Sequence, residues 1–393
     1  MSRKRSRSQE AMTTNDTTTV SSVPLVIITD ILLQLPIKSI VRFKCVSKSW
    51  LVLIKSSEFV TAHLNRSIRN HSLIVRYYNH AFGNDSGLML LRSDLKQHQV
   101  ELPPLEGLST FPKIVGSCNG LLCLDVSSAF GMAFVLWNPA TNEFKGLPTP
   151  SLTESRLKTF WMVSLGFGFN QDTNDYVLVR IVNFQARYDA IAEVYSTSTG
   201  KWKEVAAGTG SCVIYGGQDA VAVKGVLHWI ANGIGVLVNE KFVVSYDMNL
   251  ELFWRTAMPE LPTDCYVKAL SYDQSLALAV YPGLGFRSRL SNRFELWVMN
   301  EGKGWTRTFN TAFERIAWPV GSFRDSKIIM KSVDQFFLFN PKTKRNFILP
   351  IDSGMGYSYK VFTYVDSIVA VNGENDEKEV EAQIEGMVHD GSN

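Results

Sequence analysis

Two cysteines are the first candidates for chemistry in this sequence. Cys118 and Cys123 stand close together in the chain, and thiolates are among the ligands that zinc prefers in proteins. The intervening Asn119-Gly120, however, is typical of the centre of a two-residue hairpin. In that register Cys118 lies opposite Leu121 and Cys123 lies opposite Gly116, so the two thiols are not neighbours. We therefore expect two small core residues rather than a metal site.

The other possible catalytic or ligand-binding residues are isolated. His228 lies in a strand pattern beside Trp229, with no Cys, Asp or Glu at ligand spacing. The glycine-rich pieces 166–168 and 208–210 lack the third glycine and the following helix of a dinucleotide-binding loop. The sequence contains no phosphate-binding Gly-Lys-Ser/Thr loop, no nucleophile elbow and no His-Glu-x-x-His motif. These observations predict no catalytic residue, no metal and no cofactor.

The composition is that of an ordinary globular protein with a sizeable core. The 393 residues are 45% hydrophobic and 20% charged, and the formal net charge of +3 argues against nucleic acid or a membrane surface as a partner. No apolar run reaches the roughly 18 residues of a membrane span, and the polar, basic N-terminus is unlike a signal peptide. The five scattered cysteines make a poor disulfide framework, so we expect the cytoplasm, the nucleus or both.

Composition also divides the chain into four parts. Residues 1–22 are rich in Ser, Thr, Arg and Lys, which predicts a disordered tail, and its basic start fits either a nuclear-import signal or a solvated end. Residues 23–66 have a helical pattern and residues 70–372 a β-rich pattern. Residues 373–393 are acidic and predict a second disordered tail.

Short apolar stripes predict four helices between residues 23 and 66. The first helix is expected to run from Pro24 to Pro36, with apolar residues at helical spacing, namely Leu25, Ile28, Leu32 and Leu35. Ser47 and Ser57 are the expected N-caps of the third and fourth helices. So small a bundle cannot bury all of its apolar residues. The remaining apolar face either binds a partner or is covered by the larger domain.

The same stretch resembles an F-box. The resemblance rests on the leading Pro24 and on three blocks, Ile-Leu-x-x-Leu-Pro at 31–36, Lys-Ser-x-x-Arg-Phe at 38–43 and Val-Ser-Lys-x-Trp at 46–50. In that family the helices bind a SKP-family adaptor, which in turn binds a cullin. The resemblance implies an adaptor-binding surface that is built or supported by Pro24, Leu25, Ile28, Leu32, Leu35, Pro36, Val41, Arg42, Lys48 and Trp50. For each of them a purely core role is the alternative.

After His71 short apolar runs alternate with Gly, Asn, Asp and Pro turns, which predicts many short antiparallel strands. A strand–turn–strand unit with an aromatic residue on either side recurs at 135–144, 192–202, 243–254, 294–305 and 337–347. Its first aromatic recurs at intervals of about 40 to 60 residues, near the period of propeller blades. The predicted fold is mainly β with a small α domain: a helical F-box, then a six- or seven-bladed β-propeller. A large β-sandwich is the alternative.

The β-rich part also resembles the F-box-associated, kelch-like domain of plant F-box proteins. The supporting motifs lie at 116–124, 136–141, 165–169, 175–180 and 223–229. With the F-box, the resemblance covers nearly all of the chain that is expected to fold. It implies a non-catalytic subunit of an SCF-type E3 ubiquitin ligase, which binds a target protein for ubiquitination and degradation.

Target contacts are expected in the polar loops of the propeller, because such loops usually carry binding residues. The candidates are Arg156, Trp161, Arg187, Tyr188, Tyr215 and Arg287. Trp254, Trp305 and Trp318 are further aromatic candidates, although each also suits a blade core. Two other interpretations stay open: a binding or scaffolding propeller outside any ligase, for example a carbohydrate-binding one, and a propeller enzyme. The sequence does not indicate the target protein.

Overall fold

The computed structural model describes most of the chain between Pro24 and Val371. The internal residues left out are 80–85, 106–110, 129–130, 152–159, 185–189, 209, 211, 215–219, 239, 263–264, 283–292, 301–303, 325 and 352–356, together with the side chains of 79, 160, 161 and 357. Both predicted tails, 1–22 and 373–393, lie outside the described residues.

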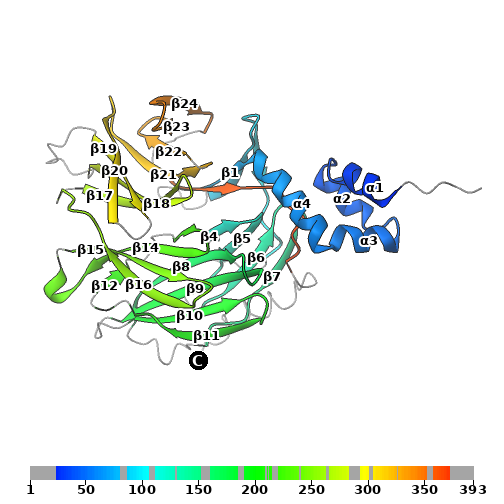
Figure 1. Ribbon diagram of the computed structural model, residues 1–393, viewed down its shortest axis with the longest axis horizontal. Coiled ribbons are helices and arrows are strands. Elements are labelled where there is room, and N and C mark those ends of the chain that lie inside the picture. The colour runs from blue at the N-terminus through cyan, green and yellow to red at the C-terminus, as the bar shows by residue number, and fades with distance from the viewer. Residues whose placement is uncertain are drawn as a thin grey trace, which may run out of the picture.

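The described chain begins with four α-helices, which stand to the right of the β-sheets in Figure 1. They are α1 (Leu25–Leu32), α2 (Ile37–Phe43), α3 (Lys48–Lys55) and α4 (Ser57–Ser67), followed by the 3-10 turn η1 (Ile68–Asn70). As predicted, Ser47 caps α3, since its Oγ accepts the Trp50 N–H at 3.2 Å. None of the helices in the described part of the chain is long and apolar enough to cross a membrane.

Two predicted helix ends differ from the structure. Helix α1 ends at Leu32, so Leu35 lies in a turn and not on the helix. The chain must leave the helical conformation there, because Pro36 is the N-cap of α2 and disfavours a helical residue before it. The N-cap of α4 is Ser56 rather than Ser57, because the backbone of Ser56 is extended and its Oγ accepts the Phe59 N–H at 3.2 Å.

The strands of the described ranges form six antiparallel sheets, the blades of a propeller. Blades 1 to 3 are formed by β25 (Tyr357–Tyr364), β1 (Ser72–Asn79), β2 (Ser86–Leu91) and β3 (Gln97–Val100); β4 (Lys113–Cys118), β5 (Leu121–Asp125), β6 (Phe134–Asn138) and β7 (Glu143–Gly146); and β8 (Phe160–Asn170), β9 (Asp175–Phe184), β10 (Ala190–Ser196) and β11 (Lys201–Ala206).

Blades 4 to 6 follow in chain order. They are formed by β12 (Cys212–Ile214), β13 (Val221–Val223), β14 (Val226–Gly233), β15 (Lys241–Asp247) and β16 (Leu252–Ala257); β17 (Cys265–Tyr272), β18 (Ser275–Pro282), β19 (Arg293–Asn300) and β20 (Gly304–Ala312); and β21 (Ala317–Phe323), β22 (Lys327–Ser332), β23 (Phe336–Asn340) and β24 (Arg345–Leu349). The 3-10 turn η2 (Gly235–Leu237) follows β14.

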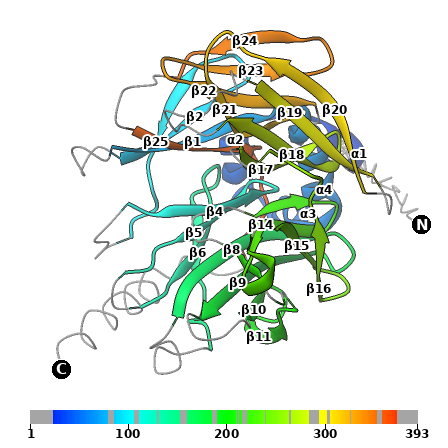
Figure 2. The same cartoon turned by 90° about the vertical axis from the view of Figure 1, so that its left-hand side faces the viewer.

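Figure 2 shows the sheets arranged side by side around a ring, with the helices behind it. The prediction of a propeller is confirmed, with six blades, and the alternative of a β-sandwich is wrong. Buried apolar clusters lie between the sheets; one, for example, joins Val179 and Ile181 of blade 3 to Trp229 and Val244 of blade 4. Neighbouring blades therefore bury each other's faces, as the repeat pattern predicted.

The five repeats found in the sequence are the outer hairpins of blades 2 to 6. They correspond to β6–β7, β10–β11, β15–β16, β19–β20 and β23–β24. Four of their first aromatic residues are buried in the blade cores, namely Trp137, Tyr195, Tyr246 and Phe339, while Trp297 is half-buried. Blade 1 lacks this repeat, because its outer hairpin is β2–β3 and its inner strand is β25, from the other end of the chain.

The strand directions define two faces of the ring. Gly116 of β4 lies against Phe167 of β8, and Asn119, just after β4, is hydrogen-bonded to Tyr176, which pairs with Phe169 near the end of β8. These two inner strands therefore run side by side in the same direction. In blades 2 and 3 the inner strand ends where the outermost strand begins, near Asn138 and Ser196. We call this end of the blades, which contacts the helices through Glu143, the helix-side face and the opposite end the far face.

Candidate functional site

The four helices leave several large apolar side chains uncovered. Their core is formed by Leu32, Ile40, Ile54 and Phe59, which are all buried. The large apolar side chains exposed around this core are Leu25, Val26, Ile27, Ile31, Val46 and Val52, and the exposed fractions reach 72% for Val26 and 71% for Val52. An exposed group of this kind on short helices is typical of a protein-binding surface.

The structure places the predicted adaptor-binding residues at different depths. Those exposed to solvent are Pro24, Leu25, Pro36, Arg42 and Lys48, and those half-buried are Ile28, Leu35, Val41 and Trp50. Leu32 is 1% exposed and belongs to the helical core, so it can only support such a surface from beneath. Trp50 packs edge-on against Phe43, with ring centroids 5.3 Å apart.

Sequence reasoning missed the most exposed apolar side chains of the helices. Val26, Ile27 and Ile31 lie off the stripe of α1 that faces the core, and Val52 is equally exposed on α3. The available signal was that Leu25–Leu32 is apolar at almost every position, while a surface helix normally has a polar side. A helix that is apolar all round and yet exposed is expected to be covered by a partner.

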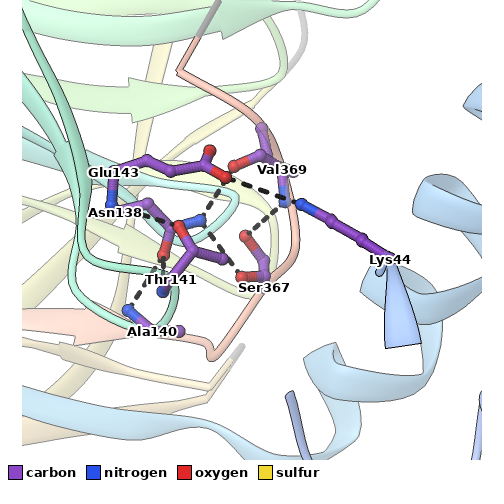
Figure 3. A network of polar contacts seen from close by, with 7 residues as sticks. All are labelled: Lys44, Asn138, Ala140, Thr141, Glu143, Ser367 and Val369. Carbon is purple, nitrogen blue, oxygen red and sulfur yellow. Dashed lines mark hydrogen bonds and ion pairs between the residues drawn. The ribbon is translucent and has the colours of Figure 1, made fainter. Parts of the chain in front are cut away.

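A polar contact joins the helices to blade 2. Lys44 at the end of α2 forms an ion pair with Glu143 at the start of β7, with 3.5 Å between Nζ and Oε1. In Figure 3, Lys44 points from the helices toward Glu143, and Asn138 lies beside Ser367 and Val369. Lys44 is half-buried, so it belongs to this junction, while Lys38, Arg42 and Lys48 remain on the solvent side of the helices.

The predicted target contacts lie outside the described side chains. For Arg156, Arg187, Tyr188, Tyr215 and Arg287 the whole residue is outside the described ranges, and for Trp161 the backbone alone is described, within β8. The described strand ends nearest to several of them are on the far face: the start of β8, the end of β9 at Phe184 and the start of β10 at Ala190. The proposed target contacts therefore stay predictions.

The three other tryptophans do not share one surface. Trp254 is on the outermost strand of blade 4 and is 38% exposed. Trp305, on the outermost strand of blade 5, is half-buried and donates its Nε1–H to the Ala257 carbonyl at 2.8 Å. Trp318 is on the inner strand of blade 6, where its ring lies 5.5 Å from Lys331 Nζ. Two of the three thus have clear packing roles within the propeller.

The cysteine pair is arranged as the hairpin predicted. Cys118 pairs with Leu121 and Gly116 pairs with Cys123, around a turn in which Asn119 (φ 51°) and Gly120 (φ 85°) both have positive φ. Burial raises the pKa of the Cys118 thiol to about 12 and raises that of Cys123 well above its ordinary value. Both groups are therefore neutral thiols, and a neutral thiol is a poor nucleophile and metal ligand.

His228 is a buried strand residue, as predicted. Its Nδ1 lies 2.8 Å from Ser245 Oγ on the neighbouring strand, and burial lowers its pKa to about 4. Within the ranges that the structure describes, no three His, Cys, Asp or Glu side chains are grouped to hold a metal ion. Gly166 has a packing reason, since a Cβ there would stand 2.4 Å from the Trp229 ring.

Comparisons with known proteins agree with this architecture. A family model described as F-box associated beta propeller domain matches residues 91–371, and a model of the F-box domain matches residues 20–61. The chain is 24% identical over 334 residues to the F-box protein CPR1 of Arabidopsis thaliana, covering 74% of this chain and 73% of that protein. It is 25% identical over 398 residues to the F-box protein At5g65850 of the same plant, covering 93% of each.

Solved structures with a similar chain path are more distant. An oligogalacturonate lyase in complex with manganese superimposes with a TM-score of 0.42 and 10% sequence identity, covering 70% of this chain and 77% of that chain. The Dos1 propeller superimposes with a TM-score of 0.37 and 10% identity, covering 74% and 76%. Likenesses at this level carry no argument about activity.

Proposed function

The chain belongs to the F-box associated β-propeller family, and from this premise we propose that it is the substrate-recognition subunit of an SCF-type E3 ubiquitin ligase. In this proposal the helices bind a SKP-family adaptor, and through it a cullin. The propeller holds a target protein. The chain supplies binding and no chemistry of its own, and it works in the cytoplasm, the nucleus or both.

The observation that carries the proposal is the set of uncovered apolar side chains on the helices. Val26, Ile31 and Val52 are exposed on short helices, and the propeller does not cover them. Leaving such side chains in water costs roughly 1.5–3 kcal/mol each relative to burial, so a protein partner that covers them gains considerable free energy. The exposed cations Lys38, Arg42 and Lys48 lie on the same helices and suit an acidic partner at the rim.

The proposed mechanism is proximity. The helices contact the helix-side face of the propeller, and the described strand ends next to the predicted target loops lie on the far face. The adaptor and the target then occupy different surfaces of the chain and do not compete. Holding both in one assembly raises the effective concentration of a target lysine near the ubiquitin-conjugating enzyme.

Co-purification with a SKP-family adaptor tests the proposal directly. We expect the wild-type chain to retain the adaptor, and Val26→Asp and Ile31→Asp to weaken the affinity by about tenfold or more, because a carboxylate would be buried against an apolar partner. Both positions are exposed, so we expect these substitutions to leave the fold intact. Leu32→Asp would be uninformative, because it places a charge in the helical core.

Val236→Asp is the matched control. Val236 is 97% exposed on η2 of the propeller, far in sequence from the helices, so the same change of side chain should leave adaptor binding unchanged. Failure of the wild-type chain to retain the adaptor would contradict the ligase function. It would favour a binding propeller that works outside a ligase.

A further inference from the structure

The residues that follow β25, the last strand of the propeller, also belong to the folded structure. After β25, residues Val365–Val371, which we call the junction segment, lead from blade 1 across the helices to blade 2. Val365, Ser367, Ile368 and Val371 are all buried. A solvated tail would not bury four of seven side chains in this way, so the segment is an integral part of the folded molecule.

The junction segment completes the helical core. Ile368 is 3% exposed and packs in one cluster with Leu32, Ile40, Ile54 and Phe59. In the part of the chain that the structure describes, Ile368 is the member of this cluster that comes from outside the helical module of residues 24–67. The helical module at the N-terminus therefore takes a core side chain from residues near the other end of the chain.

Blade 2 holds the backbone of the same segment. The side chain of Asn138, which is fully buried, donates from Nδ2 to the carbonyl oxygens of Ser367 at 3.1 Å and of Val369 at 2.8 Å (Figure 3). Val369 and Val371 continue into the apolar cluster between blades 2 and 3. Before this point, Asp366 forms an ion pair with Arg92 of blade 1 at 2.6 Å. Ile368 is thus fixed from both sides.

Elsewhere the helices stand apart from the propeller. A cleft of about 1000 Å³ lies between them, lined on the helical side by Leu33, Pro36 and His63 and on the propeller side by Leu90, His98 and Pro139. With a cleft of that size, little direct packing sets the angle between the two parts. Among the residues that the structure describes, the junction segment and the Lys44–Glu143 ion pair are contacts that bridge the two parts.

We propose that the junction segment positions the adaptor-binding helices relative to the propeller, with Asn138 as the principal positioning residue. The reason for holding the helices in place rests on the proposed ligase function, because transfer by proximity needs the target lysine at a defined place. The way in which the segment holds them rests on the contacts alone. Loss of the Asn138 bonds frees Ile368 to leave the helical core and lets the helices move against the ring.

Asn138→Asp is the sharpest test, because the two side chains have the same shape. Oδ1 of Asn138 also accepts the backbone N–H groups of Ala140 at 3.0 Å and Thr141 at 3.4 Å, and aspartate keeps that turn. The Nδ2 donor is replaced by an oxygen that repels the Ser367 and Val369 carbonyls. Losing these two buried bonds should raise the population of the detached segment by about tenfold or more.

Asn340→Asp is the matched control. Asn340 occupies the equivalent place in the repeat of blade 6, before Pro341, and accepts the N–H groups of Lys342 at 2.9 Å and Thr343 at 3.2 Å. No bond from Asn340 to the junction segment is present among the described residues, so this variant carries the same chemical change without the proposed consequence.

The measurement is the distance between a spin label on the helices and one on the propeller of the full chain. One label is attached to Cys45, the exposed native thiol on the helical module, and the other to an exposed site on blade 3 that Glu204→Cys supplies. Of the other native cysteines, Cys118 is half-buried and the remaining three are buried. We expect one narrow distance distribution for the wild-type background and for Asn340→Asp, and a broadened or second population for Asn138→Asp. An unchanged distribution in Asn138→Asp would overturn the proposal.

A second variant covers the case in which Asn138→Asp fails to fold. Ile368→Ala removes the apolar contact and leaves every hydrogen bond of the segment, and it should broaden the same distribution; a narrow one would equally overturn the proposal. Binding of the SKP-family adaptor is measured separately on each variant. A wild-type chain that binds no adaptor contradicts the ligase function, while the label distances still decide the role of the segment.

Discussion

Ser72 and Tyr364 lie directly opposite each other in an antiparallel pair, although one opens the first strand of the propeller and the other closes the last. Blade 1 is therefore built from both ends of the β-rich part, with β25 as its inner strand and β1 beside it. The pairing closes the ring, because the last strand of the propeller is hydrogen-bonded to the first. The junction segment begins directly after β25.

Truncation tests this closure. A chain that ends after Ile351 lacks β25, so blade 1 loses its inner strand and blades 2 and 6 lose the neighbour they pack on. We expect this variant to have no cooperative thermal transition by circular dichroism, because the loss exceeds the roughly 5–15 kcal/mol by which a domain is stable. A chain that ends after Val371 keeps β25 and should melt like the full chain. Cooperative melting of the shorter variant would contradict the closure.

A buried ion pair gives the second prediction. Arg180 of β9 and Glu193 of β10 are paired, and their side chains are 0% and 1% exposed. Burial lowers the pKa of Arg180, while the Glu193 carboxylate opposes that shift. Glu193→Gln leaves a buried guanidinium without its counter-charge and should lower the free energy of unfolding in urea by about 3–5 kcal/mol.

The matched double variant separates charge from packing. Arg180→Met with Glu193→Leu removes both charges together and should recover most of that loss, because a buried ion pair contributes little net stability over apolar residues of similar volume. A Glu193→Gln variant as stable as the wild type would contradict the burial of the Arg180 guanidinium.

The pH dependence of stability is the third prediction. Burial lowers the pKa of His228 to about 4, below its unfolded value near 6.5, so the unfolded chain binds the proton more readily. The contribution of His228 is complete above pH 6.5 and is lost as the pH falls from there toward 4. Its full size is about 3 kcal/mol, and urea titrations at several pH values measure it.

His228→Gln should flatten that dependence while it keeps a polar partner for Ser245. Part of the slope should remain, because burial also lowers the pKa of His63 in α4. A variant with the full wild-type slope between pH 4 and 6.5 would assign the effect to other groups.

Two glycines give the fourth prediction. Gly120 (φ 85°) and Gly200 (φ 67°) both have positive φ, so alanine costs each of them about 1–2 kcal/mol of backbone strain. A Cβ on Gly200 meets no atom within 4 Å, but on Gly120 it would stand 2.3 Å from Ser367 Oγ and 2.8 Å from the Val365 carbonyl. Gly120→Ala should therefore cost about 1–3 kcal/mol more than Gly200→Ala in urea unfolding, through displacement of the junction segment. Equal losses would contradict that close contact.

Local sequence patterns predicted the local structure well. The Asn119-Gly120 hairpin fixed the partner of Cys118, and the repeated strand–turn–strand units located five outer hairpins, because side-chain alternation and turn chemistry act between residues a few positions apart. The predicted helix limits at Pro36 and Ser57 were wrong, because the exact limits, at Leu32 and Ser56, depend on competing capping residues that the pattern does not rank.

The contacts that join distant parts of the chain needed the tertiary structure. Nothing in the sequence pairs Ser72 with Tyr364, and the apolar residue Ile368 has no periodic neighbours that mark it as part of the helical core. The turn residue Asn138 likewise has an obvious local role, but its amide Nδ2 donates to a segment more than two hundred residues away. The sequence by itself determined the family, the two modules and their hairpins, because these follow from short-range patterns. Only the tertiary structure decided how the ring closes and how the helices are held to it, because those contacts depend on which surfaces meet after folding.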